Sequence, residues 1–368
     1  MKRRAATAGS SALSRAAAQP RPQMSSTKRR AIIGAAAAAV VIFTALRLPE
    51  TRHDVYWDNH RARTRNHTIA GLGPAEEGTW RGSFHFVQLA DPQLGMLHRD
   101  ASWREELAML ALAVEHVNRL KPRFVVVSGD LINGFPGKPA VPDQVEAFER
   151  ALARLEPSIP LVLEPGNHDL GQKPTEAAVR EYQKRFGDDY LRFWVGGVLF
   201  VSLNSQLIKA AVAARSAAHA SWAAEAFGTR AERVVVLSHI CPYVGAPDEA
   251  EGWANWPLPA RRAVLAHATR AGARLWLCGH LHGNAVARHG RLEIVTSSAV
   301  GSMVNWTLTP AEIAVMSKPD FRTTVGRPSV VAGPESSGLR VVRVDEGGFR
   351  HRWYPLADVP VRLDDCKM

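Results

Sequence analysis

The chain has little cysteine, and its one candidate membrane segment is short. Only three cysteines occur in 368 residues: Cys241, Cys278 and Cys366. An odd number gives no even disulfide framework, and two of the three lie within or beside predicted core strands. We therefore expect free thiols rather than disulfides or zinc ligands. The uncharged segment 31–46 has 16 residues, slightly fewer than the ~20 that a membrane-spanning helix needs.

Acidic residues are absent from the beginning of the chain. Residues 1–47 contain nine Lys or Arg, whereas the first acid is Glu50. The net charge of +11 belongs mostly to this leader, because the other 37 basic residues face all 35 acidic ones. A protein that binds nucleic acid strongly would carry its positive excess on the folded domain. We therefore expect no nucleic-acid partner.

The basic leader has three possible interpretations. It is rich in Ser, Ala and Arg, and Lys28-Arg29-Arg30 directly precede segment 31–46. This order favours an N-terminal signal anchor over an organellar transit peptide or a disordered tail. An anchor of this kind would make the protein a single-pass membrane protein with a luminal catalytic domain. The sequons Asn66-His67-Thr68 and Asn305-Trp306-Thr307 agree with that location. The alternatives are an organellar or a cytoplasmic protein.

The pattern of elements predicts one α/β domain. Strand patterns at 84–90, 124–127 and 159–163 alternate with amphipathic helices at 103–120 and 145–155. Such a βαβ succession brings the ends of its strands to one sheet edge. A hairpin is expected across Gly196-Gly197, further helices at 175–186, 217–227 and 260–270, and strands near 234, 275, 285, 293, 340 and 349.

These elements give the predicted boundaries between the segments of the chain. We expect a linker or stem at 48–83, a catalytic domain at 84–357 and a tail at 358–368. Residues 303–337 are rich in Pro and weakly periodic, which indicates a surface excursion near the rim of a site. Trp253 and Trp256 could line that site, but aromatic residues more often anchor a segment by burial, and we expect anchoring.

Five predicted strands end in polar motifs. They are Asp91-Pro92-Gln93, Ser128-Gly129-Asp130, Asn167-His168-Asp169, the single His239, and Gly279-His280-Leu281-His282. An Asp after a strand is usually a turn or helix-cap residue, so each motif alone is weak. In this order, however, the side chains supply the ligands for two divalent metals at one edge of a sheet.

The motif series resembles the calcineurin-like metallophosphoesterase superfamily over about residues 84–356. The stretches ADPQLG, GDLINGFPGKP, GDDYLRFWVGGVLFVSLNSQ, SSAVG and GLRVVRV are further similar to the CPPED1-type branch of serine/threonine-protein phosphatases. The resemblance implies an α/β fold in which a four-layer β-sandwich is flanked by helices (αββα). It also implies a metal-dependent phosphoester hydrolase.

The resemblance assigns a role to each candidate residue. One metal would be held by Asp91, Gln93, Asp130 and His282, and the second by Asp130, Asn167, His239 and His280. His168 would protonate the leaving group or steady the transferred phosphoryl group, and Asp169 would orient His168. Two cations ~3.5–4 Å apart would neutralise the phosphate and hold the attacking water between them.

Gln93 departs from the superfamily, which usually has His at this position. Gln recurs in the CPPED1-type DPQ motif, so the change does not imply loss of function. With one imidazole fewer, the site should prefer Mn, Mg or Fe over Zn. Alternatively, Gln93 only hydrogen-bonds a metal-bound water.

Three functions are compatible with this sequence. The first is a phosphomonoesterase that acts on phosphoserine or phosphothreonine in proteins. The second is a phosphodiesterase or small-molecule phosphatase, which a luminal location would favour. The third is an inactive phospho-ligand-binding protein, although the complete residue set argues against it. Loops at 205–216, 243–258 and 303–337 would decide the phosphorylated substrate. We expect a monomer.

Overall fold

The computed structural model describes residues 50–210, 212–306, 308–316 and 328–368. The basic leader and segment 31–46 lie outside the described residues. Within the described ranges, none of the helices combines the length and the apolar character that a bilayer crossing requires.

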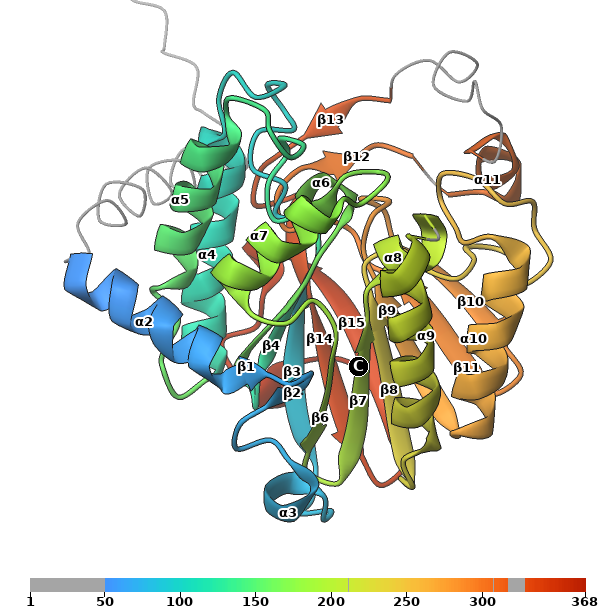
Figure 1. Ribbon diagram of the computed structural model, residues 1–368. Coiled ribbons are helices and arrows are strands. Elements are labelled where there is room, and N and C mark those ends of the chain that lie inside the picture. The colour runs from blue at the N-terminus through green and yellow to red at the C-terminus, as the bar shows by residue number, and fades with distance from the viewer. Residues whose placement is uncertain (1–49, 211, 307, 317–327) are drawn as a thin grey trace, which may run out of the picture.

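Two mixed sheets form the centre of the fold (Figure 1). The first has the order β15-β14-β3-β4-β5, and the second β10-β11-β9-β8-β7-β6. The first sheet consists of β3 (Phe84–Leu89), β4 (Val125–Ser128), β5 (Leu161–Glu164), β14 (Gly338–Asp345) and β15 (Gly348–Pro355). The second consists of β6 (Leu191–Val195), β7 (Val198–Leu203), β8 (Arg233–Ser238), β9 (Ala273–Cys278), β10 (Ala285–His289) and β11 (Leu292–Thr296). Strands β3, β4 and β5 are parallel, as are β7, β8, β9 and β11.

The sheets pack face to face through an aromatic core. The rings of Phe86 and Phe124 from the first sheet stack at 4.7 Å, and those of Phe193 and Phe200 from the second at 5.0 Å. Phe124 also meets Phe200 across the two sheets, edge to face at 5.0 Å. Strands of this kind are apolar on both faces because one face meets the other sheet and the other face meets helices.

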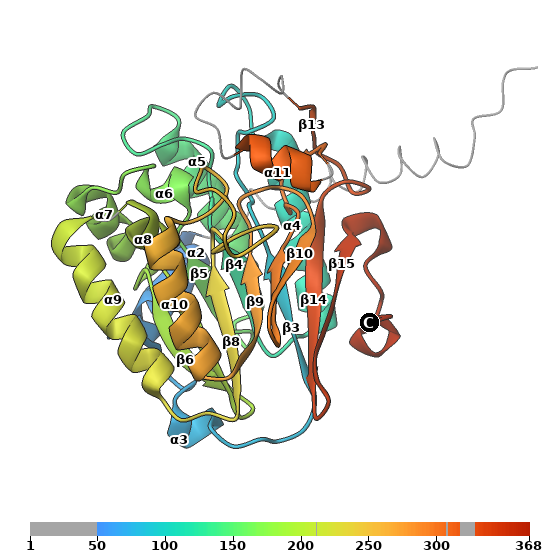
Figure 2. The same cartoon turned by 90° about the vertical axis from the view of Figure 1, so that its right-hand side faces the viewer.

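Helices cover the outer face of each sheet and complete the predicted αββα layers. Helices α4 (Arg104–Leu120) and α5 (Val141–Leu152) pack on the first sheet, and α9 (Ala213–Gly228) and α10 (Leu258–Arg270) on the second. Figures 1 and 2 show these pairs on opposite sides of the sandwich. Helix α5 begins earlier than predicted, because Pro142 suits its first turn. The shorter helices are α6 (Asn167–Leu170), α7 (Glu176–Phe186) and α8 (Ser205–Ala210).

The predicted linker at 48–83 is wrong for its described part. Residues 50–83 contain helix α2 (Glu50–Arg63), the hairpin β1 (Thr64–Arg65) and β2 (Thr68–Ile69), and α3 (Pro74–Glu77). The Trp57 ring is buried against Phe148 and Phe186, and its Nε1 donates to the Glu149 carbonyl at 3.0 Å. One tryptophan anchors a polar helix here, so no apolar periodicity reveals it. The segment is part of the folded body.

The predicted excursion lies partly at the ligand edge. Its described residues form α11 (Pro310–Met316) and the two-stranded pair β12 (Met303–Val304) and β13 (Val330–Val331). The Trp306 indole nitrogen donates to the carbonyl of Leu281 at 2.6 Å. Since Leu281 separates two candidate histidine ligands, this part of the excursion lies at the rim of the site, as the sequence predicts.

Two short 3-10 turns, Leu356–Asp358 and Leu363–Asp365, complete the chain.

Candidate metal centre

The structure brings the motifs of both sheets to one edge. Asp91 and Gln93 follow β3, Asp130 follows β4 and Asn167 begins α6 after β5, while the three histidines follow β8 and β9. Five of these residues have left-handed backbone: Asp91 (φ 48°), Gln93 (34°), Asp130 (48°), His280 (73°) and His282 (53°). Each such residue costs on the order of 1–3 kcal/mol and persists only where its surroundings hold it, which is typical of functional sites.

Glycines make the close approach of the ligand loops possible. A Cβ atom on Gly166 would lie 2.1 Å from Asp130 Oδ1, and one on Gly279 would lie 2.4 Å from Asp91 Oδ2. Both distances are shorter than atoms tolerate. The Gly-Asn and Gly-His dipeptides of the motifs therefore leave room for carboxylates that come from other strands.

Asp130, Asn167, His239 and His280 form one of two ligand groups. His239 Nε2 lies 3.2 Å from Asn167 Oδ1 and 3.3 Å from Asp130 Oδ2. One ligand atom each of Asp130, His239 and His280 lies within 4.8 Å of the others, and all three residues are buried. This is the group that the resemblance assigns to the second metal.

The other group, Asp91, Gln93, Asp130 and His282, meets it through Asp130. His282 Nε2 lies 3.6 Å from Asp91 Oδ1. Gln93 Oε1 is buried and, among the described residues, accepts no hydrogen bond. A buried amide oxygen without a partner costs about 1–3 kcal/mol, and a cation would satisfy it. The donor set fits two divalent cations, and the Gln93 oxygen favours direct ligation over a bridging water.

Backbone carbonyls fix which nitrogen each histidine offers. Ser128 O lies 2.8 Å from His239 Nδ1, Trp253 O lies 3.2 Å from His280 Nε2, and Ser302 O accepts from His282 Nδ1. A carbonyl oxygen can only accept, so each of these ring nitrogens carries the proton. His239 Nε2, His280 Nδ1 and His282 Nε2 remain available to a cation.

Burial and mutual attraction shift the ionisation of the ligands. Burial raises the pKa of Asp91 well above its usual range. Burial acts on Asp130 in the same direction, but the His239 and His168 side chains hold the pKa of Asp130 below its usual value. Burial alone would lower the pKa of His239, whereas the carboxylates of Asp130 and Asp91 raise it to about 10, so a cation that binds His239 Nε2 would displace a proton from it. The buried centre is thus organised around paired opposite charges.

His168 lies beside both ligand groups without joining either. Its Nδ1 donates to the Asn133 carbonyl, its Nε2 lies 3.0 Å from Gln93 Nε2, and its ring stacks on Phe135 with centroids 4.3 Å apart. Its backbone N–H donates to Asp130 Oδ1 at 2.8 Å. The side chain therefore contacts one ligand group through Gln93, and the backbone contacts both groups through Asp130.

Asp169 does not orient the His168 ring as expected. Its carboxylate accepts hydrogen bonds from the backbone N–H groups of Gly166 at 2.7 Å and Leu131 at 3.0 Å. These bonds tie the loop after β5 to the loop after β4, so Asp169 holds the motif loops together. Asn133 orients the ring instead. The sequence motif GD-x-x-N contained this residue, but spacing alone gave it no role.

The two tryptophans of the loop 243–258 differ in position. Trp256 is fully buried and donates from Nε1 to the Ile240 carbonyl at 3.0 Å, so it is the expected anchor. Trp253 is only partly buried and packs its ring 4.1 Å from the His280 ring. Its carbonyl also holds His280, as described above. Trp253 therefore supports a candidate ligand, a role that the sequence did not reveal.

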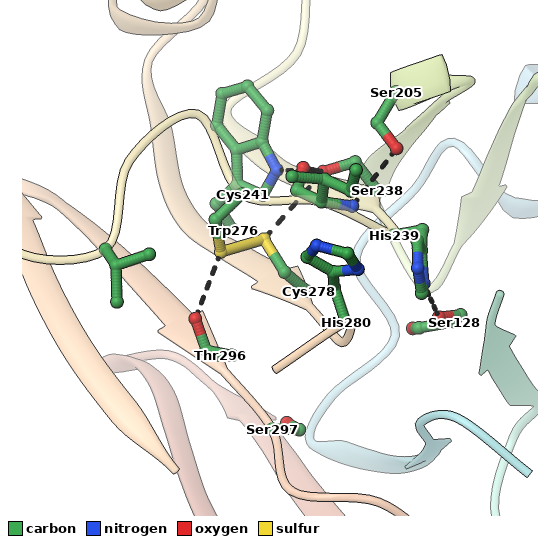
Figure 3. Close-up of a disulfide and its surroundings, with 12 residues drawn as sticks. Ser128, Ser205, Ser238, His239, Cys241, Trp276, Cys278, His280, Thr296 and Ser297 are labelled. Carbon is green, nitrogen blue, oxygen red and sulfur yellow. Dashed lines mark hydrogen bonds between the residues drawn. A yellow bond between two sulfur atoms is a disulfide. The ribbon is translucent and has the colours of Figure 1, made fainter. Parts of the chain in front are cut away.

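The prediction of three free thiols is wrong, because Cys241 and Cys278 form a disulfide (Figure 3). Their Cα atoms are 5.5 Å apart; Cys241 lies in the loop after β8, and Cys278 ends the neighbouring strand β9. Figure 3 shows His239 and His280 beside the bridge. Cys366 is a free, partly buried thiol. The pairing depends on the order of strands in the sheet, which a cysteine count cannot supply.

Comparisons with known proteins found similar sequences and a similar fold. A family model described as calcineurin-like phosphoesterase matches residues 84–284. The chain is 33% identical over 317 residues to the serine/threonine-protein phosphatase CPPED1 of Danio rerio, which covers 82% of this chain and 94% of the relative. The Bos taurus protein of the same name is 34% identical over 82% of this chain and 92% of its own length. The structure of Plasmodium GAP50, the anchor in the inner membrane complex, shares the fold, with 11% identity, a TM-score of 0.52, and coverage of 76% of this chain and 87% of that one.

Proposed function

The chain belongs to the calcineurin-like phosphoesterase family and is a metal-dependent phosphoester hydrolase; on this premise we propose that it removes phosphate from phosphoserine or phosphothreonine in proteins. The observation that carries the proposal is the similarity to relatives named serine/threonine-protein phosphatase over 82% of the chain. The gathered ligand set, from Asp91 to His282, supports it. We assign two divalent cations to the ligand groups described above.

The residues of the site perform distinct parts of the hydrolysis. When bound, two divalent cations neutralise the phosphate oxygens and lower the pKa of the attacking water. Asp130 belongs to both ligand groups and keeps them adjacent. Asp91 accepts the His280 backbone N–H at 2.9 Å and so fixes the loop that carries two histidines. The chain would thereby hold the cation-binding side chains in place before substrate arrives.

We propose that His168 gives a proton to the departing oxygen from Nε2. Its Nδ1 stays bonded to the Asn133 carbonyl. In the observed arrangement Nε2 accepts from the Gln93 amide nitrogen at 3.0 Å. Nε2 would first take a proton from solvent, which would place two donors face to face and break its hydrogen bond to Gln93, so that the new N–H could then donate its proton to the leaving group. We also propose Mn, Mg or Fe over Zn, since Gln93 replaces an imidazole.

The disulfide supports a second candidate substrate class and a location. Disulfides persist in oxidising compartments and are rare in the cytosol. We propose on this ground, together with the basic leader, that the catalytic domain faces a lumen behind an N-terminal anchor. In such a compartment small phosphoesters are the alternative substrates.

The test compares substrates and metals on the full-length protein. After chelation, Mn²⁺, Mg²⁺, Fe²⁺ or Zn²⁺ is restored, and turnover is measured on p-nitrophenyl phosphate and on a phosphothreonine peptide. A higher kcat/KM on the peptide is expected. A preference for small esters would support the second class. Absence of turnover from folded protein with every metal would support the phospho-ligand-binding alternative.

A further inference from the structure

The Gln93 side chain must present a particular end of its amide to a cation. An amide oxygen accepts and can ligate a metal, whereas an amide nitrogen donates and cannot. The nitrogen lies 2.9 Å from Asn133 Oδ1 and 3.0 Å from His168 Nε2, and the oxygen is the buried atom that accepts no bond from the described residues. Nothing in Gln93 itself selects this orientation, so its neighbours must.

Asn133 has the same ambiguity, and Asp100 resolves it. Asn133 Nδ2 donates to Asp100 Oδ1 at 2.8 Å. A carboxylate only accepts, so the nitrogen of Asn133 must face Asp100 and its oxygen must face Gln93. The oxygen of Asn133 in turn requires the nitrogen of Gln93. One carboxylate therefore fixes the direction of Asn133, and the Asn133 oxygen, together with the His168 Nε2 acceptor, selects the nitrogen of Gln93.

The Asp100 carboxylate is itself held by a third, fully buried amide. Gln144 Nε2 donates to Asp100 Oδ1 at 2.8 Å, and Gln144 Oε1 accepts from the Gly134 backbone N–H at 2.9 Å. A backbone N–H only donates, so the orientation of Gln144 is also unique. A Cβ atom on Gly95 would lie 2.4 Å from Gln144 Nε2, and glycine leaves the space that this contact needs. Asp100 adopts a left-handed backbone with φ of 68° to reach it.

We propose that Asp100 is a positioning residue of the metal centre. Acting through Asn133, it turns Gln93 Nε2 toward His168. It thereby turns Gln93 Oε1 toward the cation that Gln93 shares with Asp91 and His282. We call Asp100, Asn133 and Gln93 the amide relay. It rests on the proposed two-metal centre. If the relay were reversed, an N–H group of Gln93 would face the cation, and electrostatic repulsion would weaken binding at that position.

The first test replaces Asp100 by Ala in the full-length protein, with Mn²⁺ as the probe. Alanine offers no acceptor, so position 100 no longer selects one orientation of Asn133. Loss of a residue that orients a ligand typically lowers metal affinity about 10–100-fold, and we expect this loss for one of the two Mn²⁺ ions. Calorimetry gives the two affinities, and electron paramagnetic resonance separates a coupled Mn²⁺ pair from a single ion.

A double-mutant cycle tests whether Asp100 acts through Asn133. Asn133→Ala should lower the affinity for the same Mn²⁺ ion, because it removes the oxygen that faces Gln93 Nε2 and keeps the carbonyl that holds His168. Asp100→Ala with Asn133→Ala should lower the affinity no further than Asn133→Ala alone, since the effects of two residues that act in series do not add. Asp58→Ala, on the exposed face of α2, makes the same chemical change away from the site and should leave both affinities unchanged.

The outcomes distinguish a failure of the relay from a failure of the two-metal centre. Two ions bound with unchanged affinity by Asp100→Ala would refute the relay, as would additive losses in the double variant. Fewer than two ions on the unaltered protein would refute the two-metal centre instead, and the relay with it. If Asp100→Ala does not fold, Asn133→Ala alone tests the relay, and unchanged affinity there would also refute it.

Discussion

His239 Nε2 lies 3.3 Å from Asp130 Oδ2 in the buried centre of the site, and the two residues come from different sheets. Their contact joins the loops of the two sheets at the ligand groups. Asp130 also accepts the His168 backbone N–H. A change at Asp130 therefore affects both ligand groups and the proposed acid together.

Asp130→Asn should abolish tight binding of both cations. The substitution removes the one charged ligand that the two groups share, while the volume of the side chain is kept. We expect fewer than one Mn²⁺ per chain after gel filtration, measured by elemental analysis, and a loss of turnover. Asp358→Asn, at an exposed position, is the matched control. Retention of both ions by Asp130→Asn would contradict the bridging assignment.

His168→Ala should slow turnover while both cations stay bound. Removal of a general acid typically costs about 10²–10⁴-fold in rate. The loss should be larger for a phosphothreonine peptide than for p-nitrophenyl phosphate, because nitrophenolate leaves without a proton. Rates on both substrates are compared with those of the exposed control His98→Ala. An equal loss on the two substrates would argue for phosphoryl binding by His168 rather than proton transfer.

Glu164→Gln should make the pH dependence of stability less steep. Burial raises the pKa of Glu164 from 4.5 to about 8. Between these values the unfolded chain has lost a proton that the folded protein keeps, so stability falls with rising pH, by about 1.4 kcal/mol per pH unit. Glutamine does not titrate, and the stability of the variant relative to the parent should rise from pH 5 to pH 8 in urea unfolding. The exposed control Glu232→Gln should follow the parent. A constant difference across this range would refute the assignment.

Reduction of the Cys241–Cys278 bridge should destabilise the domain. The two cysteines are 37 positions apart, and the chain-entropy model then gives about 4 kcal/mol of stabilisation. Cys241→Ser with Cys278→Ser should lose a similar amount in denaturant unfolding, whereas Cys366→Ser should retain the bridge. Thiol counting in denaturant should give one thiol before reduction and three after it. Three thiols without reduction would show that the bridge does not form.

The sequence alone determined the candidate ligands and the layers. The convergence of Asp91, Asp130, Asn167, His239, His280 and His282 was predictable because each follows a strand whose apolar pattern is local, and parallel strands place their ends together. The hairpin across Gly196-Gly197 followed from a local turn signal, and helix α4 followed from an amphipathic spacing within one segment. Family resemblance then supplied the chemistry.

Only the tertiary structure decided the contacts between distant segments. The disulfide required β8 and β9 to be neighbours, and the burial of Trp57 required α5 and α7 to meet beside α2. Asp100 carries no local signal, since its partners Asn133 and Gln144 are 33 and 44 positions away. Asp169 was assigned to His168 because they are adjacent in sequence, yet its hydrogen bonds run to Gly166 and to Leu131, in another loop. Sequence patterns report periodicity and spacing along the chain, whereas hydrogen-bond direction depends on which donors and acceptors folding brings within reach.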